Sequence, residues 1–248
     1  MKAAFIHEQL EYRLEVAKDG IRQGDLLPCT LLIKNHDAAS KTISDLRFEL
    51  AYGETKAIKE KKPDAFETVA SATLALPIEL APGQQHSITW GCQLDRNCAI
   101  SEKSKGLYFL YGRSSGQLGQ QPISVQAHAD TEAILRIFET SFQFVLKGQR
   151  SSKGWFYAKL KPPTSKRFSM LTELGLGFHF ENGGLALCYN FNEKRFESSR
   201  MTTGVNSKKT AVDRHIAETS YLLSGGFINQ EAVEAEINQA LKVAAFEL

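Results

Sequence analysis

The chain has 248 residues, of which 42% are hydrophobic and 23% are charged, and its formal net charge is +2. This balance is ordinary for a soluble globular protein. It contains no run of about 18 apolar residues, which argues against a membrane-spanning helix. Residues 1–12 include Glu8 and lack the apolar stretch of a signal peptide. We therefore expect a cytoplasmic protein built from one large β domain or two ordinary domains.

The four cysteines point to a reducing compartment rather than to a metal centre. They are Cys29, Cys92, Cys98 and Cys188, they are far apart, and none forms a CxxC pair. A chain of this length does not need disulfides to be stable. Three of the four lie in strand patterns, where a cysteine is a small core residue. We expect free thiols, no metal site and no cofactor.

The first half of the chain shows the alternation of short strands. Apolar and polar residues alternate over residues 10–16, 27–33, 46–52, 69–76 and 88–94, and residues 107–111 are apolar on both faces. Turn signals separate them, including Pro82-Gly83 at the centre of a predicted type II turn. Residues 54–68 are charged and interrupted by a proline, which is typical of a solvated loop. The pattern predicts a β-sandwich over residues 1–127.

A short helix is expected where this pattern ends. Asp130-Thr131 can cap a helix in which Ile134, Leu135, Ile137 and Phe138 recur at helical spacing. The helix should end near residue 141. We interpret residues 128–141 as a connector between two β units.

A hairpin follows at residues 168–196. Asn182-Gly183 is a strong signal for a two-residue type I′ turn. That loop predicts four cross-strand pairs on one face: Phe180–Leu185, Phe178–Leu187, Leu176–Tyr189 and Leu174–Phe191. The other face carries small or polar residues, with Gly175 and Gly177 nearly bare, which suits the close approach of another backbone or of a partner.

Three of these features together resemble the arrestin-like sporulation-control proteins of bacteria over residues 10–196. They are the stretch LAPGQQHSITWGCQL, the short helix and the hairpin LTELGLGFHFENGGLALCYNFNEKRF. The resemblance implies a mainly β fold with two arrestin-like β-sandwich units, the second at residues 142–197. It also implies a regulator or scaffold rather than an enzyme, and it brings no catalytic residue. The strand before the family's hairpin is aromatic and acidic, whereas here residues 155–162 are aromatic and basic.

The basic character of this region is the main functional signal. Residues 141–171 contain seven basic residues and no acidic one. In a strand over residues 155–161, the side chains of Trp155, Tyr157, Lys159 and Lys161 share one face. Such a face suits phosphate, a nucleic-acid strand or an anionic membrane surface. The alternative is a solvated strand face whose lysine stems cover neighbouring aromatics. We predict an anionic-partner surface made of Lys153, Trp155, Tyr157, Lys159, Lys161, Lys166 and Arg167.

Residues 198–248 are expected to form a linker and a helical hairpin. Residues 197–209 are polar, and a first helix is predicted to start at residues 210–213 and to end at Gly225-Gly226. Asn229 can cap a second helix with an apolar stripe from Val233 to Ala244. The simpler interpretation packs this hairpin on the sandwich. The other makes it a detachable tail whose acidic final helix masks the basic strand.

Motifs for catalysis are absent from the sequence. Gly175-Leu176-Gly177 lacks a third glycine, and no GxSxG, HExxH or Walker-type loop occurs. His179 is interpreted as a hydrogen-bonded histidine rather than a general base. We therefore expect a non-catalytic adaptor or scaffold that acts through protein–protein interaction, with a homodimer also conceivable. The alternative is a β-sandwich module for a small ligand, a glycan or an anionic, phosphate-bearing partner.

Overall fold

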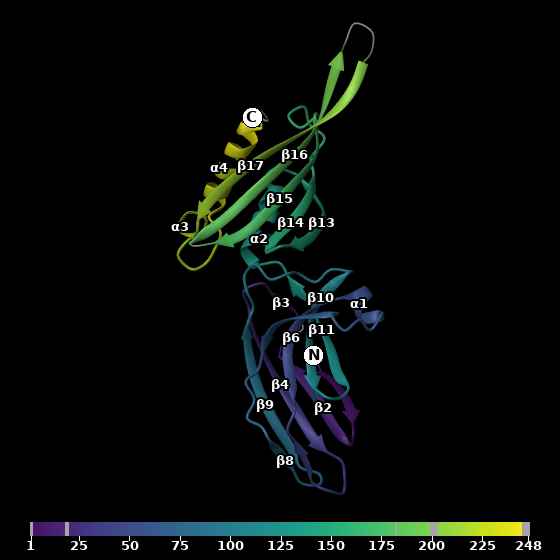
Figure 1. The fold of residues 1–248 in the computed structure, drawn as a ribbon. Helices are drawn as coiled ribbons and strands as arrows, with labels where there is room; N and C mark the ends of the chain where they lie inside the picture. The colour runs from purple at the N-terminus through teal and green to yellow at the C-terminus, as the bar shows by residue number, and fades with distance from the viewer. Residues whose placement is uncertain (1, 18–19, 182, 199–202, 245–248) are drawn as a thin grey trace. The chain divides into compact units, whose positions relative to one another are not determined.

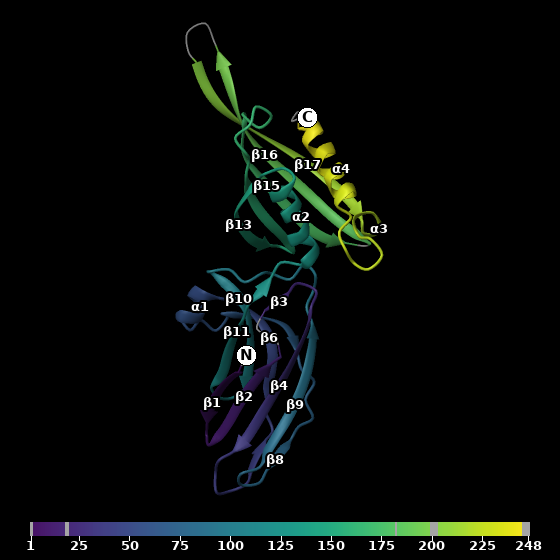
Figure 2. The same cartoon turned by 180° about the vertical axis from the view of Figure 1, so that it is seen from behind.

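The structure is a computed structural model that describes residues 2–17, 20–181, 183–198 and 203–244. Its contacts divide the chain into two compact units, Met1–Gln126 (unit 1) and Ala127–Leu248 (unit 2). Figures 1 and 2 show both units, and each is described by itself below.

Unit 1 consists almost entirely of strands arranged in two main sheets. One sheet has the order β1-β2-β4-β9 and the other the order β11-β10-β6-β7, and two small pairs, β12-β3 and β5-β8, complete it. The elements are β1 (Lys2–His7), β2 (Leu10–Val16), β3 (Ile21–Arg22), β4 (Leu26–Asn35), β5 (Lys41–Ile43), β6 (Arg47–Glu54), α1 (Thr55–Lys59), β7 (Phe66–Ser71), β8 (Ile78–Leu80), β9 (Gln85–Gln93), β10 (Lys105–Gly112), β11 (Leu118–Ile123) and β12 (Val125–Gln126).

The alternation seen in the sequence builds the core of unit 1. In β2 and β4 every second side chain is buried, and these side chains join those of β6 and β10 in one apolar cluster. Aromatic contacts link the two sheets, because the ring centroid of Phe48 in β6 lies 5.3 Å from that of Trp90 in β9. Two sheets that share one apolar core form a sandwich. The stretch expected to be a loop contains the short helix α1 and the start of β7.

Unit 2 is a single five-stranded antiparallel meander that carries helices. Its strand order is β13-β14-β15-β16-β17, which is also the order in the chain. The elements are α2 (Ala129–Thr140), β13 (Val145–Ser152), β14 (Trp155–Lys161), β15 (Leu171–Glu181), β16 (Gly184–Ser198), β17 (Thr203–Ala217), α3 (Glu218–Tyr221) and α4 (Gln230–Val243).

The central hairpin has the predicted register. All four predicted apolar pairs occur between β15 and β16, and Glu181 pairs with Gly184 across the turn. Gly183 has a φ of +71°, the left-handed conformation for which glycine is suited. Asn182, the other predicted turn residue, lies outside the described residues. The turn chemistry and the period-two pattern were therefore sufficient to predict this register.

Helices α2 and α4 lie on the apolar face of this sheet (Figures 1 and 2). Phe138 of α2 contacts the buried ring of Tyr189, with centroids 6.4 Å apart. Helix α4 buries the predicted stripe of Val233, Ile237, Ala240, Leu241 and Ala244. The two helices are linked by a hydrogen bond from the Ser141 hydroxyl to Glu234 (2.6 Å). Besides connecting the units, α2 is therefore part of the core of unit 2.

The chain is mainly β, with several antiparallel sheets and short helices that include a C-terminal one, as predicted. In unit 2, however, the layer that faces the sheet consists of helices α2 and α4 rather than a second sheet. The predicted linker and first C-terminal helix are wrong, because β17 runs from Thr203 to Ala217. Val212 and Ile216 are four residues apart, a spacing that fits one helical face and one strand face equally well. These residues form a strand because the buried side chains of Tyr189 and Leu185 in β16 lie opposite Val212 and Ile216.

Strands β16 and β17 extend past the rest of their sheet. Strand β15 pairs with β16 only as far as Glu193, whereas β16 and β17 stay paired out to Ser198 and Thr203. The outer part is therefore a two-stranded ribbon, drawn in bright green in Figure 1. The base of this ribbon borders the site described next.

Candidate interaction surface

The sheet face of unit 2 opposite α2 and α4 carries the candidate site, and we call it the open face. Its residues are the odd-numbered ones of β14 and β15 and their partners in β16, including Trp155, Tyr157, Gly177 and Cys188. The other face is buried under the helices: it carries the even-numbered residues of β14, those of β15 from Leu174 onward, and the odd-numbered residues of β16 from Leu185 to Phe191. This alternation follows from the pleat, which directs successive side chains to opposite faces.

A row of stacked side chains stands on the open face, and we call it the aromatic stack. The Arg150 guanidinium carbon lies 5.2 Å from the ring centroid of Tyr157. The Tyr157 ring stacks on Trp155 at 6.2 Å and 22°. Trp155 in turn stacks on His179 at 5.2 Å and 25°. The stack thus consists of one cation and three rings drawn from β13, β14 and β15, and it presents ring edges to solvent.

A glycine and a backbone hydrogen bond hold the stack in place. A Cβ atom on Gly177 would lie 3.1 Å from both Trp155 and Tyr157, so the rings occupy the space that a larger residue would fill. The Nδ1 atom of His179 donates to the Gly154 carbonyl at 2.8 Å, which orients the ring. Of the two bare positions noted in the sequence, Gly177 lies under the Trp155 and Tyr157 rings, whereas a Cβ atom on Gly175 would meet Asn190.

A groove of about 750 Å³ opens where β14 ends and the β16–β17 ribbon begins. We call it the basic groove, because Lys161, Lys166 and Lys194 line it and no carboxylate does. The loop that follows β14 contributes the hydroxyls of Thr164 and Ser165. Five groups that can donate hydrogen bonds thus surround one open space.

The acidic residues closest to the groove along the strands are already bonded. Glu173 forms an ion pair with Lys159 and accepts from Asn192 at 3.4 Å. Glu193 accepts from the Thr210 hydroxyl at 3.1 Å. The charge of Lys159 is therefore partly balanced, whereas Lys161, Lys166 and Lys194 have no ion-pair partner within the described part of the chain.

The structure divides the predicted anionic surface into four parts, one of which is Lys159 with its ion-pair partner Glu173. Lys153 lies exposed in the turn before β14, next to Trp155 and Tyr157 of the stack. Lys161 and Lys166 lie in the groove. Arg167 is elsewhere: its guanidinium covers the Phe168 ring at 4.9 Å and donates to Asn238 of α4 at 3.4 Å. Burial lowers the pKa of Arg167. Arg167 therefore belongs to the contact between its loop and α4.

Two comparisons with known proteins find nothing: no family model matches the chain, and no curated protein does. A comparison of structures finds the crystal structure of Spo0M, a sporulation control protein from Bacillus subtilis. The TM-score is 0.68 at 16% identity, and the match covers 96% of this chain and 99% of that one. The chain has the Spo0M fold. The resemblance seen in the sequence is confirmed as a likeness of fold.

Another structural match is much weaker and carries no argument. It is the alkylpurine DNA glycosylase AlkC from Pseudomonas fluorescens bound to DNA containing an abasic site analogue. The TM-score is 0.30 at 15% identity, over 48% of this chain and 31% of that chain.

Lys194 is the groove residue that the sequence did not predict. It follows Lys161 by 33 positions, lies in a different strand, and is followed at once by the arginine of a charged stretch. A hydrogen bond from its backbone nitrogen to the Met170 carbonyl (2.8 Å) fixes β16 against the loop. The proximity of Lys194 to Lys161 is a property of the sheet, and no local pattern signals it.

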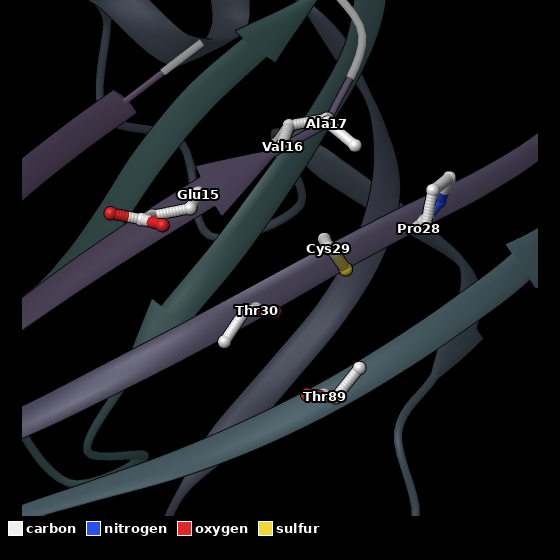
Figure 3. Close-up of a pocket in the computed structure, with 7 residues that line it drawn as sticks. All are labelled: Glu15, Val16, Ala17, Pro28, Cys29, Thr30 and Thr89. Atoms are coloured by element: carbon white, nitrogen blue, oxygen red, sulfur yellow. The ribbon is translucent and has the colours of Figure 1, made fainter.

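A second cavity, of about 310 Å³, lies beside β2, β4 and β9 in unit 1. Figure 3 shows the seven residues that line it, among them Glu15 and Cys29. The Cys29 thiol donates to the Trp90 carbonyl at 3.3 Å, and burial raises its pKa to about 12. Burial therefore favours the protonated form of this thiol at neutral pH, which disfavours nucleophilic chemistry at Cys29.

The remaining thiols behave in the same way. All four cysteines are free. Burial raises the pKa of Cys98 and of Cys188 to about 11, and that of Cys92 also rises. Among the described residues, no three His, Cys, Asp or Glu side chains gather as a metal site. No described helix is long and apolar enough to cross a membrane.

Proposed function

We propose that the protein is an intracellular, non-catalytic adaptor with a regulatory role, which binds partner proteins through the open face of unit 2. The observation that carries this proposal is the difference between the two faces of one sheet. Helices cover the apolar face, whereas no helix in the described part of unit 2 covers the face with the aromatic stack and the basic groove. Aromatic residues and arginine are enriched in the cores of protein interfaces, so the stack suits an anchor for a partner.

Three further observations support the proposal. The fold is that of a protein named for sporulation control, which is a regulatory role. The four free thiols agree with a reducing compartment. Among the described residues, the lining of the groove contains lysines and hydroxyls and no carboxylate that would pair an acid with a base for catalysis.

The test compares wild type with an Arg150→Ala, Trp155→Ala variant in cross-linked pull-downs with quantitative mass spectrometry. The expected result is that a defined set of proteins is captured by wild type and is depleted by the variant. A Lys56→Ala, Lys59→Ala variant of α1 is the control, since it removes exposed charge from unit 1. Each partner recovered is then purified, and its binding to purified wild type and to each purified variant is measured. Equal capture by all three forms contradicts the proposal.

A second candidate function is a module that binds a small ligand or a glycan. The half-buried rings of the stack favour it, because aromatic side chains can form a platform for sugars. A glycan array with wild type and the Trp155→Ala variant tests this directly. Binding that is lost in the variant and insensitive to salt favours the glycan, whereas strong salt dependence favours a charged partner.

A further inference from the structure

The basic groove has features of its own, separate from those of the stack. Its three lysines come from the end of β14, the following loop and the base of the ribbon. None of the three pairs with a carboxylate of the described residues, and Thr164 and Ser165 of the same loop also line the groove. Three unbalanced ammonium groups around one cavity attract an anion, and the attraction grows with the charge of that anion.

The loop that frames the groove is held in place before any ligand arrives. Phe168 is buried and packs edge-on against Phe144, with centroids 5.1 Å apart. The Ser169 hydroxyl donates to the Lys166 carbonyl at 2.9 Å, and the Leu171 nitrogen donates to the Phe168 carbonyl at 3.0 Å. A fixed loop loses little conformational freedom when it binds, so less of the binding energy is lost.

We propose that the basic groove binds a phosphate monoester in its doubly charged form. A phosphate group presents three oxygens that accept hydrogen bonds, and at neutral pH it carries close to two negative charges. Three lysines and two hydroxyls match both properties, whereas a single carboxylate would leave ammonium groups unbalanced. The inference goes beyond the proposed function by naming the chemical group that the site recognises.

The molecule that carries the phosphate follows from the proposed function, on which this step rests. It is a phosphorylated side chain of a partner protein. Lys161 and Trp155 share one side of β14, and the six residue steps from one to the other span about 20 Å. An extended partner segment of similar length can therefore place a phosphate in the groove and an apolar residue against the stack.

The experiment uses phenyl phosphate as the probe and phenyl sulfate, of the same shape with one charge, as its control. Wild-type protein labelled with ¹⁵N is titrated at pH 7.5 and constant ionic strength. Phenyl phosphate is expected to give saturable shifts confined to the amides of residues 161–172 and of Lys194, with the sulfate at least about fivefold weaker. At pH 5 the phosphate should bind more weakly, because its second pKa is about 6, and the sulfate should not change.

Two single variants and one matched control complete the test. Lys194→Gln and Lys166→Gln should each weaken phenyl phosphate binding about tenfold, since each removes a charge-assisted hydrogen bond. Lys56→Gln removes the same charge from α1 in unit 1, outside the groove and the stack, and should bind like wild type. The ¹⁵N spectrum of each variant shows directly whether it is folded. Equal binding of the sulfate, or of Lys194→Gln and wild type, overturns the site.

The source is tested separately with peptides and membranes. A phosphoserine peptide that competes with phenyl phosphate, while its unphosphorylated form does not, supports a protein source. Competition by phosphatidic acid vesicles without competition by the peptide overturns that source and leaves the phosphate site standing. Conversely, phosphate binding without any captured partner would count against the adaptor function alone.

Discussion

The two faces of the sheet in unit 2 are built from the same strands but differ in the size and the burial of their side chains. The face under α2 and α4 is lined by large apolar side chains such as Leu176, Phe178 and Tyr189, each almost fully buried. The open face carries Gly175, Gly177 and Cys188 at the positions between them. Burial of the first set supplies the stability of the unit, because a buried aromatic or aliphatic side chain contributes about 1.5–3 kcal/mol.

The difference teaches that the small residues of the open face shape its surface rather than stabilise the fold. They leave room for rings that come from neighbouring positions, as Gly177 does for Trp155 and Tyr157. We therefore expect substitutions to lower stability most on the helix-covered face and least on the open face.

The largest effect is expected for Phe178→Ala on the helix-covered face. The side chain is 2% exposed and packs against Phe156 at 5.8 Å, so its removal leaves a cavity. We expect the free energy of unfolding of unit 2 to fall by about 3–5 kcal/mol. Urea unfolding followed by the fluorescence of Trp155, in a Trp90→Phe background, reports on this unit alone. The control Lys161→Ala should change it by less than about 0.5 kcal/mol. Equal effects of the two substitutions would remove the distinction between the faces.

The second effect concerns the contact between β17 and α4. The Arg214 guanidinium donates to both carboxylate oxygens of Glu236 and to Gln239. Glu236 stays largely buried, so Arg214→Ala leaves its carboxylate without this partner and should cost about 1–2 kcal/mol. Arg214→Lys keeps the charge and should recover part of that loss. Hydrogen exchange of the α4 amides measures whether the helix loosens. Unchanged protection in Arg214→Ala would show that apolar burial alone holds α4.

The third effect distinguishes two glycines on the open face. Gly177→Ala brings a Cβ within 3.1 Å of two rings, and the stack must shift, at a cost of about 1 kcal/mol. Gly175→Ala meets its nearest atom, the Cβ of Asn190, at an ordinary 3.5 Å and should change stability by less than about 0.5 kcal/mol. The emission maximum of Trp155 should move only in Gly177→Ala. The same emission spectrum for both variants would contradict the packing of the stack over Gly177.

The smallest effect concerns the reactivity of Cys188 and leaves the fold unchanged. Burial, and after it the neighbouring carboxylate of Asp213, raise its pKa to about 11. Alkylation by iodoacetamide should therefore be slow at pH 8, because little thiolate is present. Asp213→Asn should speed it, since each unit by which the pKa falls increases the thiolate about tenfold. Peptide mapping measures the rate at Cys188 alone, with Cys29 as the internal reference. An unchanged rate would mean that Asp213 does not act on this thiol.

Much of the fold could be predicted from the sequence, because its strongest signals are local. The turn at Asn182-Gly183 and the alternation of Phe178, Phe180, Leu185 and Leu187 were enough for the register of the central hairpin. The cap at Asn229 was enough for the start of α4, where its side chain accepts from the Ala232 nitrogen at 3.4 Å. In each case the determining contacts lie within a few residues of each other.

What only the tertiary structure decided involves residues that are distant in the chain. The apolar residues of β17 fit a helix as well as a strand, and pairing with β16 selected the strand. Arg167 and Lys166 are neighbours in the sequence, yet Arg167 packs against α4 while Lys166 lines the groove. Lys194 lines the same groove as Lys161 only because the meander places β14 and β16 in one sheet. A sequence determines the period and the turns of its own elements, whereas the side chains that meet across strands depend on the burial of the whole sheet.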